Sequence, residues 1–134
     1  MRLYRPFSLV MLVIFLLVGI LFLTMPAGVL GFFNSFSANL GLSPVPTQVS
    51  YLYLGLAVAY MALVSTLAFL MYRQPTNHYF PLLLAVGKLS SSALSLVLFL
   101  FVQRSLACLV NFAIDGAIGA AAALFAAGIR RSSR

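Results

Sequence analysis

Residues 7–25 read FSLVMLVIFLLVGILFLTM, an apolar run in which no side chain is charged. A helix needs about 20 such residues, at about 1.5 Å each, to cross roughly 30 Å of hydrocarbon, so this run predicts a transmembrane helix. Three further stretches share its length and character, at residues 50–72, 79–102 and 106–129. The runs are too long for strands and lack apolar–polar alternation. We therefore expect an all-α, polytopic integral membrane protein with a four-helix bundle.

The composition of the chain also favours a membrane protein. Of the 134 residues, 63% are hydrophobic and 7% are charged, whereas a soluble domain carries about a quarter charged residues. A soluble enzyme, a disordered tail and a disulfide-rich scaffold are therefore excluded. One Cys, one His and one acidic residue are too few for a conventional metal site, and no cofactor motif is present. We expect residues 1–134 to form a single membrane domain without metal or cofactor.

The run at residues 7–25 has a second interpretation, because Arg2 and Arg5 precede it as in a signal peptide. The run is longer than the apolar region of a typical signal peptide, and residues 25–28 (MPAG) make a poor cleavage site. We therefore expect this segment to be retained as the first transmembrane helix.

The basic residues predict the orientation in the membrane. With four crossings, both termini and the second connection lie on one side, and Arg104 lies on the other. The basic side chains of the first side are Arg2, Arg5, Arg73, His78, Arg130, Arg131 and Arg134. This bias predicts cytoplasmic termini in the inner (cytoplasmic) membrane of the cell. The net charge of +7 then indicates contact with anionic lipid headgroups and not with nucleic acid.

The first connection, residues 26–42, is long and uncharged. Pro26 can begin a helix, and the apolar residues after it recur at helical spacing. These residues are Val29, Leu30, Phe33, Phe36 and Leu40. We expect a short amphipathic helix on the outer leaflet, whose apolar contacts include Phe32, Phe33, Phe36 and Leu40. A lid over the helix ends, or a face buried against a partner subunit, is an equal alternative.

Ionisable residues inside the apolar segments are the candidate functional site. Asp115 is the only acidic residue, and Lys88 lies in the preceding segment. A charge at such a depth costs at least about 2.5–3.5 kcal/mol, so both side chains should face the bundle or a cavity. A short turn joins the two segments into a helical hairpin, in which two polar stripes can face each other. The stripes consist of Lys88, Ser91, Ser92 and Ser95 on one helix and Asn111, Asp115 and Gly119 on the other.

The depth of these residues predicts how they pair. Asp115 lies about nine residues into its helix, or roughly 13 Å deep, at the level of Ser92 and Ser95. Lys88 lies a turn or two nearer the cytoplasm, and we expect its side chain to extend in that direction. Asp115 should then bond to the serines and Asn111, with an ion pair to Lys88 as the alternative. Such a polar cluster serves either as a packing contact between helices or as a proton or substrate site.

Small residues in the last segment predict close helix packing. Gly116 and Ala120 form one small-x-x-x-small pattern, and Gly119 and Ala123 form another. These four residues are candidates for contact with a neighbouring helix or with another subunit.

The length and the four crossings, with a loop after the first, resemble the small bacterial DoxX-like membrane proteins. This resemblance implies a four-helix inner-membrane protein, which in some members is associated with respiratory or redox partners. The first segment lacks the acidic residue of the small multidrug-resistance transporters. Cys108 stands alone, unlike the Cys-x-x-Cys pair of the vitamin-K-epoxide-reductase-like enzymes.

Two functions are compatible with these residues. No nucleophile, base and acid lie within reach of one another, so we expect a protein that is not an enzyme. Our first expectation is an accessory or assembly subunit of a larger membrane complex, which binds other membrane subunits or further copies of itself. The alternative is a minimal carrier or channel that forms a homo-oligomer, with a polar path along Lys88, Ser92 and Asp115.

Overall fold

The computed structural model describes residues 3–132, and over that range the chain forms five α-helices and no strand. They are α1 (Tyr4–Thr24), α2 (Pro26–Asn39), α3 (Tyr51–Arg73), α4 (Tyr79–Phe101) and α5 (Leu106–Ser132). All except α2 are long and apolar enough to cross a membrane. The predicted all-helical architecture with four long apolar helices is therefore confirmed. Arg2 and Arg134, on which the predicted orientation partly depends, lie outside the described residues.

Two helices extend beyond the predicted apolar segments. α1 begins at Tyr4, where the buried Tyr4 ring packs edge-on against Phe125 with 5.3 Å between ring centroids. Pro6 lies in the first turn of α1, where a proline is tolerated. α5 continues through Arg130 and Arg131, because basic side chains are favourable in the last turn of a helix. Hydropathy alone therefore underestimates both helices.

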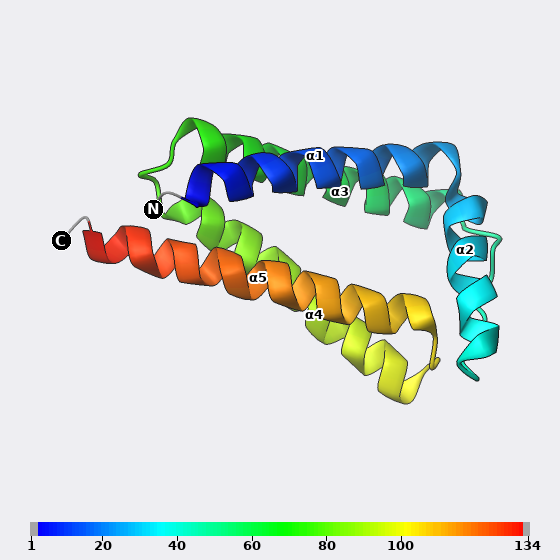
Figure 1. Cartoon of the computed structure of the whole chain (residues 1–134). Helices are drawn as coiled ribbons and strands as arrows, with labels where there is room; N and C mark the ends of the chain where they lie inside the picture. Colours follow the sequence, from blue (N-terminus) through cyan, green and yellow to red (C-terminus); the bar gives the residue numbers. More distant parts are fainter. Residues whose placement is uncertain (1–2, 133–134) are drawn as a thin grey trace.

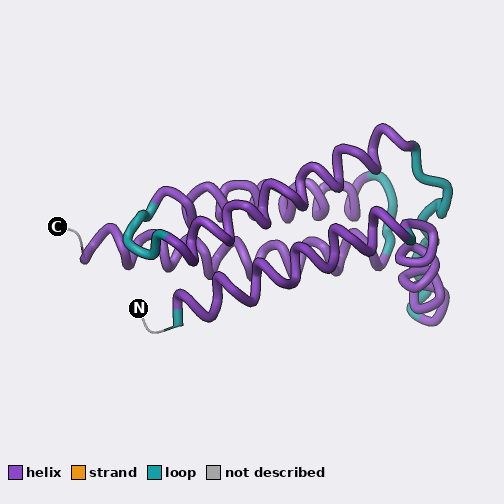
Figure 2. Tube along the Cα trace, turned by 90° about the horizontal axis from the view of Figure 1, so that it is seen from above, coloured by secondary structure: helices purple, strands orange, loops and turns teal. Residues whose placement is uncertain are grey.

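The long helices form two antiparallel pairs, α1 with α3 and α4 with α5 (Figure 1). Both ends of the chain lie at one end of the bundle, which we call the termini end. The two pairs lie close together there and diverge toward the opposite end. α2 runs across that opposite end, which we call the α2 end (Figures 1 and 2).

The buried apolar core lies toward the termini end, where the two pairs meet. It includes residues from all four long helices: Tyr4, Val64, Ala68, Met71, Leu84, Ala85, Ala122 and Ile129. Each of them lies in the half of its helix that is nearer the termini end. Apolar side chains thus pack the two helix pairs tightly against each other at the termini end.

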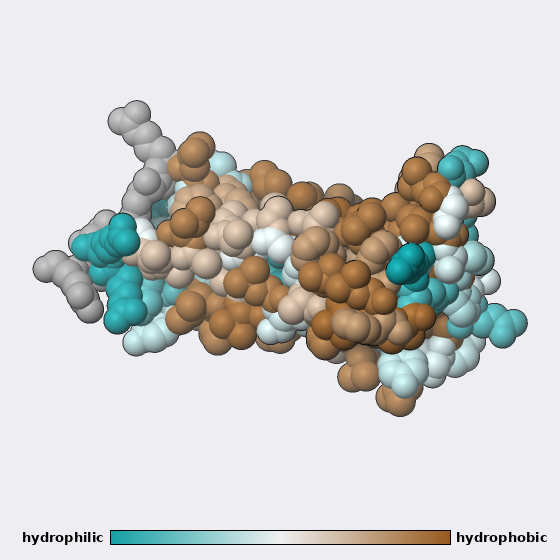
Figure 3. Space-filling view, turned by 90° about the horizontal axis from the view of Figure 1, so that it is seen from below, coloured by the Kyte–Doolittle hydropathy of each residue, from teal (hydrophilic) through white to brown (hydrophobic). Residues whose placement is uncertain are grey.

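The outer surface of the bundle is apolar along its length. Figure 3 shows hydrophobic side chains over the middle of one face and hydrophilic ones gathered toward the two ends. Leucines such as Leu17, Leu63 and Leu94 are more than half exposed. A water-soluble protein rarely exposes so extended an apolar surface, whereas the helices of a multi-pass membrane protein face lipid in this way.

The predicted short helix after the first long helix is present as α2, and its apolar side chains lie on more than one face. Phe32 and Phe36 are 61% and 49% exposed, and Leu40 follows the end of the helix. Phe33 instead points into the bundle. Asn34 of α2 also faces the protein, because its side chain bonds to the backbone of Val45 in the following loop.

The loop between α2 and α3 joins α2 to the turn between α4 and α5. Asn34 donates from Nδ2 to the carbonyl of Val45 and accepts from its N–H, both at 2.7 Å. Gln103 Nε2 donates to the carbonyl of Pro44 at 2.6 Å, and Ser43 N donates to the carbonyl of Arg104 at 2.9 Å. The α2 end is therefore held by polar contacts, in contrast to the apolar core at the termini end.

We expect Asn34→Ala to loosen the α2 end without unfolding the bundle. The substitution removes two hydrogen bonds, each of which contributes about 1 kcal/mol, so local opening should become at least about tenfold more frequent. The rate at which N-ethylmaleimide labels Cys108, the third residue of α5, measures this opening. Asn39→Ala is the control, because Asn39 lies at the exposed end of the same helix. Equal labelling rates in the two variants would show that the Asn34 contacts do not hold the α2 end.

Candidate functional site

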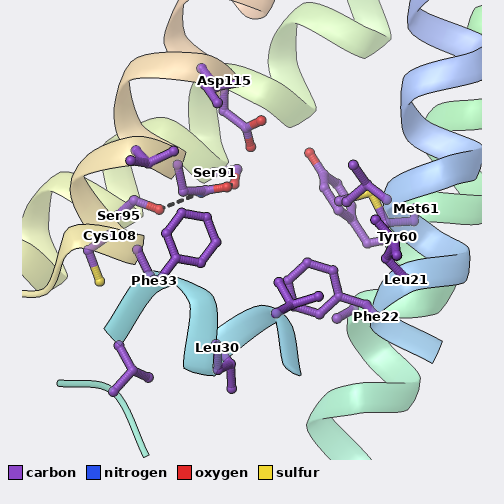
Figure 4. A pocket seen from close by; sticks show the side chains of 18 of the residues that line it. Leu21, Phe22, Leu30, Phe33, Tyr60, Met61, Ser91, Ser95, Cys108 and Asp115 are labelled. Atoms are coloured by element: carbon purple, nitrogen blue, oxygen red, sulfur yellow. Dashed lines mark hydrogen bonds between the residues drawn. The ribbon is translucent and has the colours of Figure 1, made fainter. Parts of the chain in front are cut away.

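A cavity of about 530 Å³ lies between the two helix pairs on the α2 side of the core. All five helices contribute to its wall, and Figure 4 shows side chains from them converging on the space. Most of the wall is apolar, formed by side chains such as Phe22, Leu30 and Phe33. Its volume falls within the range of about 300–1,000 Å³ typical of small-molecule sites.

The polar end of the cavity holds the two ionisable residues predicted to matter. Lys88 of α4 and Asp115 of α5 form an ion pair, with 2.8 Å between Nζ and Oδ1. Their side chains are 2% and 6% exposed. A buried charge is tolerated only when it is paired, so each residue accounts for the presence of the other.

The structure shows the alternative prediction, an ion pair, and the first expectation, in which Asp115 bonds to serines and Lys88 extends away from it, is wrong. Lys88 lies nine residues after Tyr79, the first residue of α4, which is about 13 Å along the helix axis. A lysine side chain is too short to reach water over that distance, and apolar core residues such as Leu84 occupy the intervening space. The ammonium group therefore extends to Asp115, the one carboxylate within the bundle.

Two aromatic rings complete the surroundings of the Lys88 ammonium group. Nζ lies 4.6 Å from the ring centroid of Phe15 and 5.2 Å from that of Tyr60. An ammonium group within about 6 Å of an aromatic face is attracted to it. α1 and α3 thus help to stabilise the ammonium charge of Lys88 on α4, which Asp115 on α5 neutralises.

The remaining polar candidates form a second set of contacts between α4 and α5. Asn111 Nδ2 donates to Ser95 Oγ at 2.7 Å and to Ser91 Oγ at 3.1 Å. Ser92 Oγ donates to the carbonyl of Phe112 at 2.8 Å. Ser91, Ser95 and Asn111 line the cavity together with the ion pair, whereas Ser92 lies between the helices.

The small residues differ in their surroundings. A Cβ atom at Gly116 would lie 3.0 Å from Ser92 Oγ, and one at Gly119 would lie 2.8 Å from the Leu89 side chain. Both glycines therefore allow α4 and α5 to approach closely. Ala123 packs against the core, whereas Ala120 is exposed on the outside of the bundle.

Sequence reasoning missed Tyr60, whose hydroxyl is buried and has no hydrogen-bond partner among the described residues. Figure 4 shows this hydroxyl and the carboxylate of Asp115 pointing toward each other across the cavity. A signal existed, because Tyr60 lies near the middle of an apolar segment, whereas tyrosines of membrane helices favour the ends. The contacts of Asn34 and Gln103 with the loop gave no comparable signal.

Within the described residues, no three His, Cys, Asp or Glu side chains lie close enough to hold a metal ion. Cys108 lies in the cavity wall beside Phe33. The four helices that are long and apolar enough to cross a membrane indicate a multi-pass membrane protein, with a cavity between its helix pairs. No protein-family model, curated protein or solved structure matches this chain.

Proposed function

We propose that this chain is a small non-catalytic protein of the inner membrane that acts as an accessory or assembly subunit of a larger membrane complex. The observation that carries this proposal is the set of paired polar side chains that joins α4 to α5. Lys88 is paired with Asp115, and Asn111 is bonded to Ser91 and Ser95. Groups that are engaged in this way stabilise a fixed hairpin and leave no activated nucleophile or free base in it.

The apolar core at the termini end supports the same function. Residues such as Met71, Leu84 and Ala122 are fully buried there and separate the polar end of the cavity from that end of the bundle. Hydrophobic constrictions close pores by dewetting, so packing of this kind argues against a permanent aqueous channel. The resemblance of the layout to DoxX-like proteins agrees with a subunit that works beside redox or respiratory partners.

In this proposal both termini face the cytoplasm. Arg5, Arg73, Arg130 and Arg131 belong to the termini end, and Arg104 belongs to the turn at the α2 end. The arginines of the termini end would contact anionic lipid headgroups, with α2 in the outer leaflet. The net positive charge would then serve the membrane contact, and no nucleic acid would be bound.

The accessory role predicts that the chain purifies together with other membrane subunits. We expect extraction in a mild detergent, followed by native mass measurement, to give a reproducible complex in which this chain is a minor part. The mass of the chain after denaturation identifies it within the complex. Recovery of the chain alone, or of a complex made only of its own copies, would contradict the accessory role.

A carrier is the second candidate, and the cavity is the observation that favours it. The cavity approaches the ion pair from the α2 side, so a solute entering there would meet Lys88 and Asp115 midway through the bundle. Transport would require the core at the termini end to open. A homo-oligomer whose uptake activity is lost in Asp115→Asn would favour this candidate over the accessory role.

A further inference from the structure

We propose that the cavity between the helix pairs binds one neutral amphiphile with a single hydroxyl head, such as a long-chain alcohol or a neutral lipid with one free hydroxyl. The hydroxyl head of the amphiphile would lie between Tyr60 and Asp115, and its alkyl chain would extend toward α2. This inference goes beyond the accessory role and does not depend on the identity of any partner subunit.

The head group follows from two polar atoms that face each other. The Tyr60 hydroxyl is buried without a partner, and such a donor is costly to leave unsatisfied. Lys88 occupies Oδ1 of Asp115, and no described residue donates a hydrogen bond to Oδ2. A ligand hydroxyl can accept from Tyr60 and donate to Oδ2 at once, whereas an ether or ester oxygen can only accept.

The absence of a charge on the ligand follows from the ion pair. Lys88 and Asp115 neutralise each other, so an added carboxylate or ammonium would be a third, uncompensated charge. Uncompensated charges in a low-dielectric site are strongly disfavoured. The cavity should therefore select an alcohol over a permanently charged amphiphile of the same chain length, such as an alkylsulfonate or a quaternary alkylammonium.

We infer the alkyl chain of the ligand from the cavity walls and from the depth of the polar end of the cavity. The walls toward α2 are formed by apolar side chains such as Val18, Phe22 and Leu30. Asp115 lies nine residues into α5, about 13 Å along its axis from the α2 end. A phospholipid entering tail first would place a methyl group against polar atoms, whereas an amphiphile with a small head can bury that head there.

Cys108 provides a native reporter, because it lies in the cavity wall seven residues before Asp115. The experiment measures the rate at which N-ethylmaleimide labels Cys108 in nanodiscs, with dodecan-1-ol, dodecane-1-sulfonate or dodecyltrimethylammonium added. We expect dodecan-1-ol to slow labelling at least about fivefold and the two charged compounds to leave the rate within about twofold. Equal slowing by all three would indicate non-specific partitioning, and no slowing by the alcohol would indicate a cavity filled by water. Either result would overturn the proposal.

Tyr60→Phe tests the head group separately from the fold. The substitution removes a hydroxyl that bonds to nothing in the described part of the chain, so the free energy of unfolding should not fall. The dodecan-1-ol concentration that gives half protection of Cys108 should rise about three- to tenfold, as expected for one lost hydrogen bond. Unchanged protection in Tyr60→Phe would contradict the assigned head position.

Ala57→Phe tests the cavity itself. Ala57 lines the cavity from α3, so a phenyl ring there should occupy the space and abolish protection by dodecan-1-ol. Ala59→Phe is the matched control, because Ala59 is an exposed residue of the same helix that does not line the cavity. Protection that persists in Ala57→Phe, or that is lost equally in Ala59→Phe, would refute binding in this cavity. These experiments test ligand binding by the chain itself. Their failure would not contradict the accessory role, which the search for partner subunits tests.

Discussion

Asp115→Leu is expected to lower the free energy of unfolding by about 3–5 kcal/mol, the largest single effect we predict. The variant leaves the Lys88 ammonium group among Phe15, Tyr60 and apolar core residues, without its counter-ion. The lysine is too far from either end of α4 to reach water, so the charge has no alternative partner in the bundle. Unfolding by sodium dodecyl sulfate in mixed micelles, followed by circular dichroism, measures the change.

The double variant Lys88→Met with Asp115→Leu distinguishes a buried pair from two independent polar residues. When both charges are replaced by apolar side chains, no uncompensated charge remains, and the double variant should be more stable than either single variant. Thr66→Leu is the control, because Thr66 is an exposed polar residue of α3 and its replacement should change stability by less than about 0.5 kcal/mol. Additive losses from the two single variants would contradict a direct interaction.

Gly119→Leu is expected to destabilise the α4–α5 hairpin by about 3 kcal/mol. A Cβ atom at this position would lie 2.8 Å from Leu89 Cγ and 3.1 Å from the Leu89 backbone nitrogen, so the helices would have to separate. Overpacking of this kind typically costs about 1–3 kcal/mol, and the separation would also lengthen the contact between Lys88 and Asp115. The same unfolding titration measures the loss.

Gly55→Leu is the matched control for this prediction. Gly55 lies in α3 and a Cβ atom there meets nothing within 4 Å, so the same substitution should cost little. Gly119→Ala should show an intermediate loss of about 1 kcal/mol, because its added methyl group meets Leu89 without the rest of a leucine side chain. If Gly119→Leu were as stable as Gly55→Leu, close approach of α4 and α5 would not be needed.

The long helices could be predicted from the sequence because each needs enough apolar residues to cross the hydrocarbon of a membrane. Apolar runs of about 20 residues identify α1, α3, α4 and α5 without knowledge of their packing. Their ends were less accurate, since the start of α1 depends on the contact of Tyr4 with Phe125. That contact joins residues from opposite ends of the chain, and no local pattern reports it.

The candidate site was only partly predictable. Lys88 and Asp115 stand out because charges are rare in apolar segments, but their pairing depends on the direction in which one flexible side chain extends. Counting residues inward from the turn placed Lys88 too deep to meet Asp115. The length of the lysine side chain, and the apolar packing on its other side, decide the contact.

The enclosure of the site was predictable only as one alternative, in which residues 26–42 form a lid over the helix ends. The cavity exists because the two helix pairs diverge and α2 crosses the open end (Figure 1). The bonds that hold this arrangement, such as Gln103 to Pro44, join residues far apart in the chain. Side-chain periodicity within α2 suggested a helix on a surface, whereas Asn34 anchors it to the loop.

The charges of Lys88 and Asp115 neutralise each other, and a distance measurement by solid-state NMR in lipid bilayers tests this pairing most directly. The chain contains one lysine and one aspartate, so labelling with ¹⁵N-lysine and ¹³C-aspartate gives a single Nζ–Cγ pair. We predict strong dipolar dephasing from a distance of at most about 4 Å, the sum of the 2.8 Å Nζ–Oδ1 contact and one C–O bond. Absence of dephasing would place the two charges apart and contradict the account.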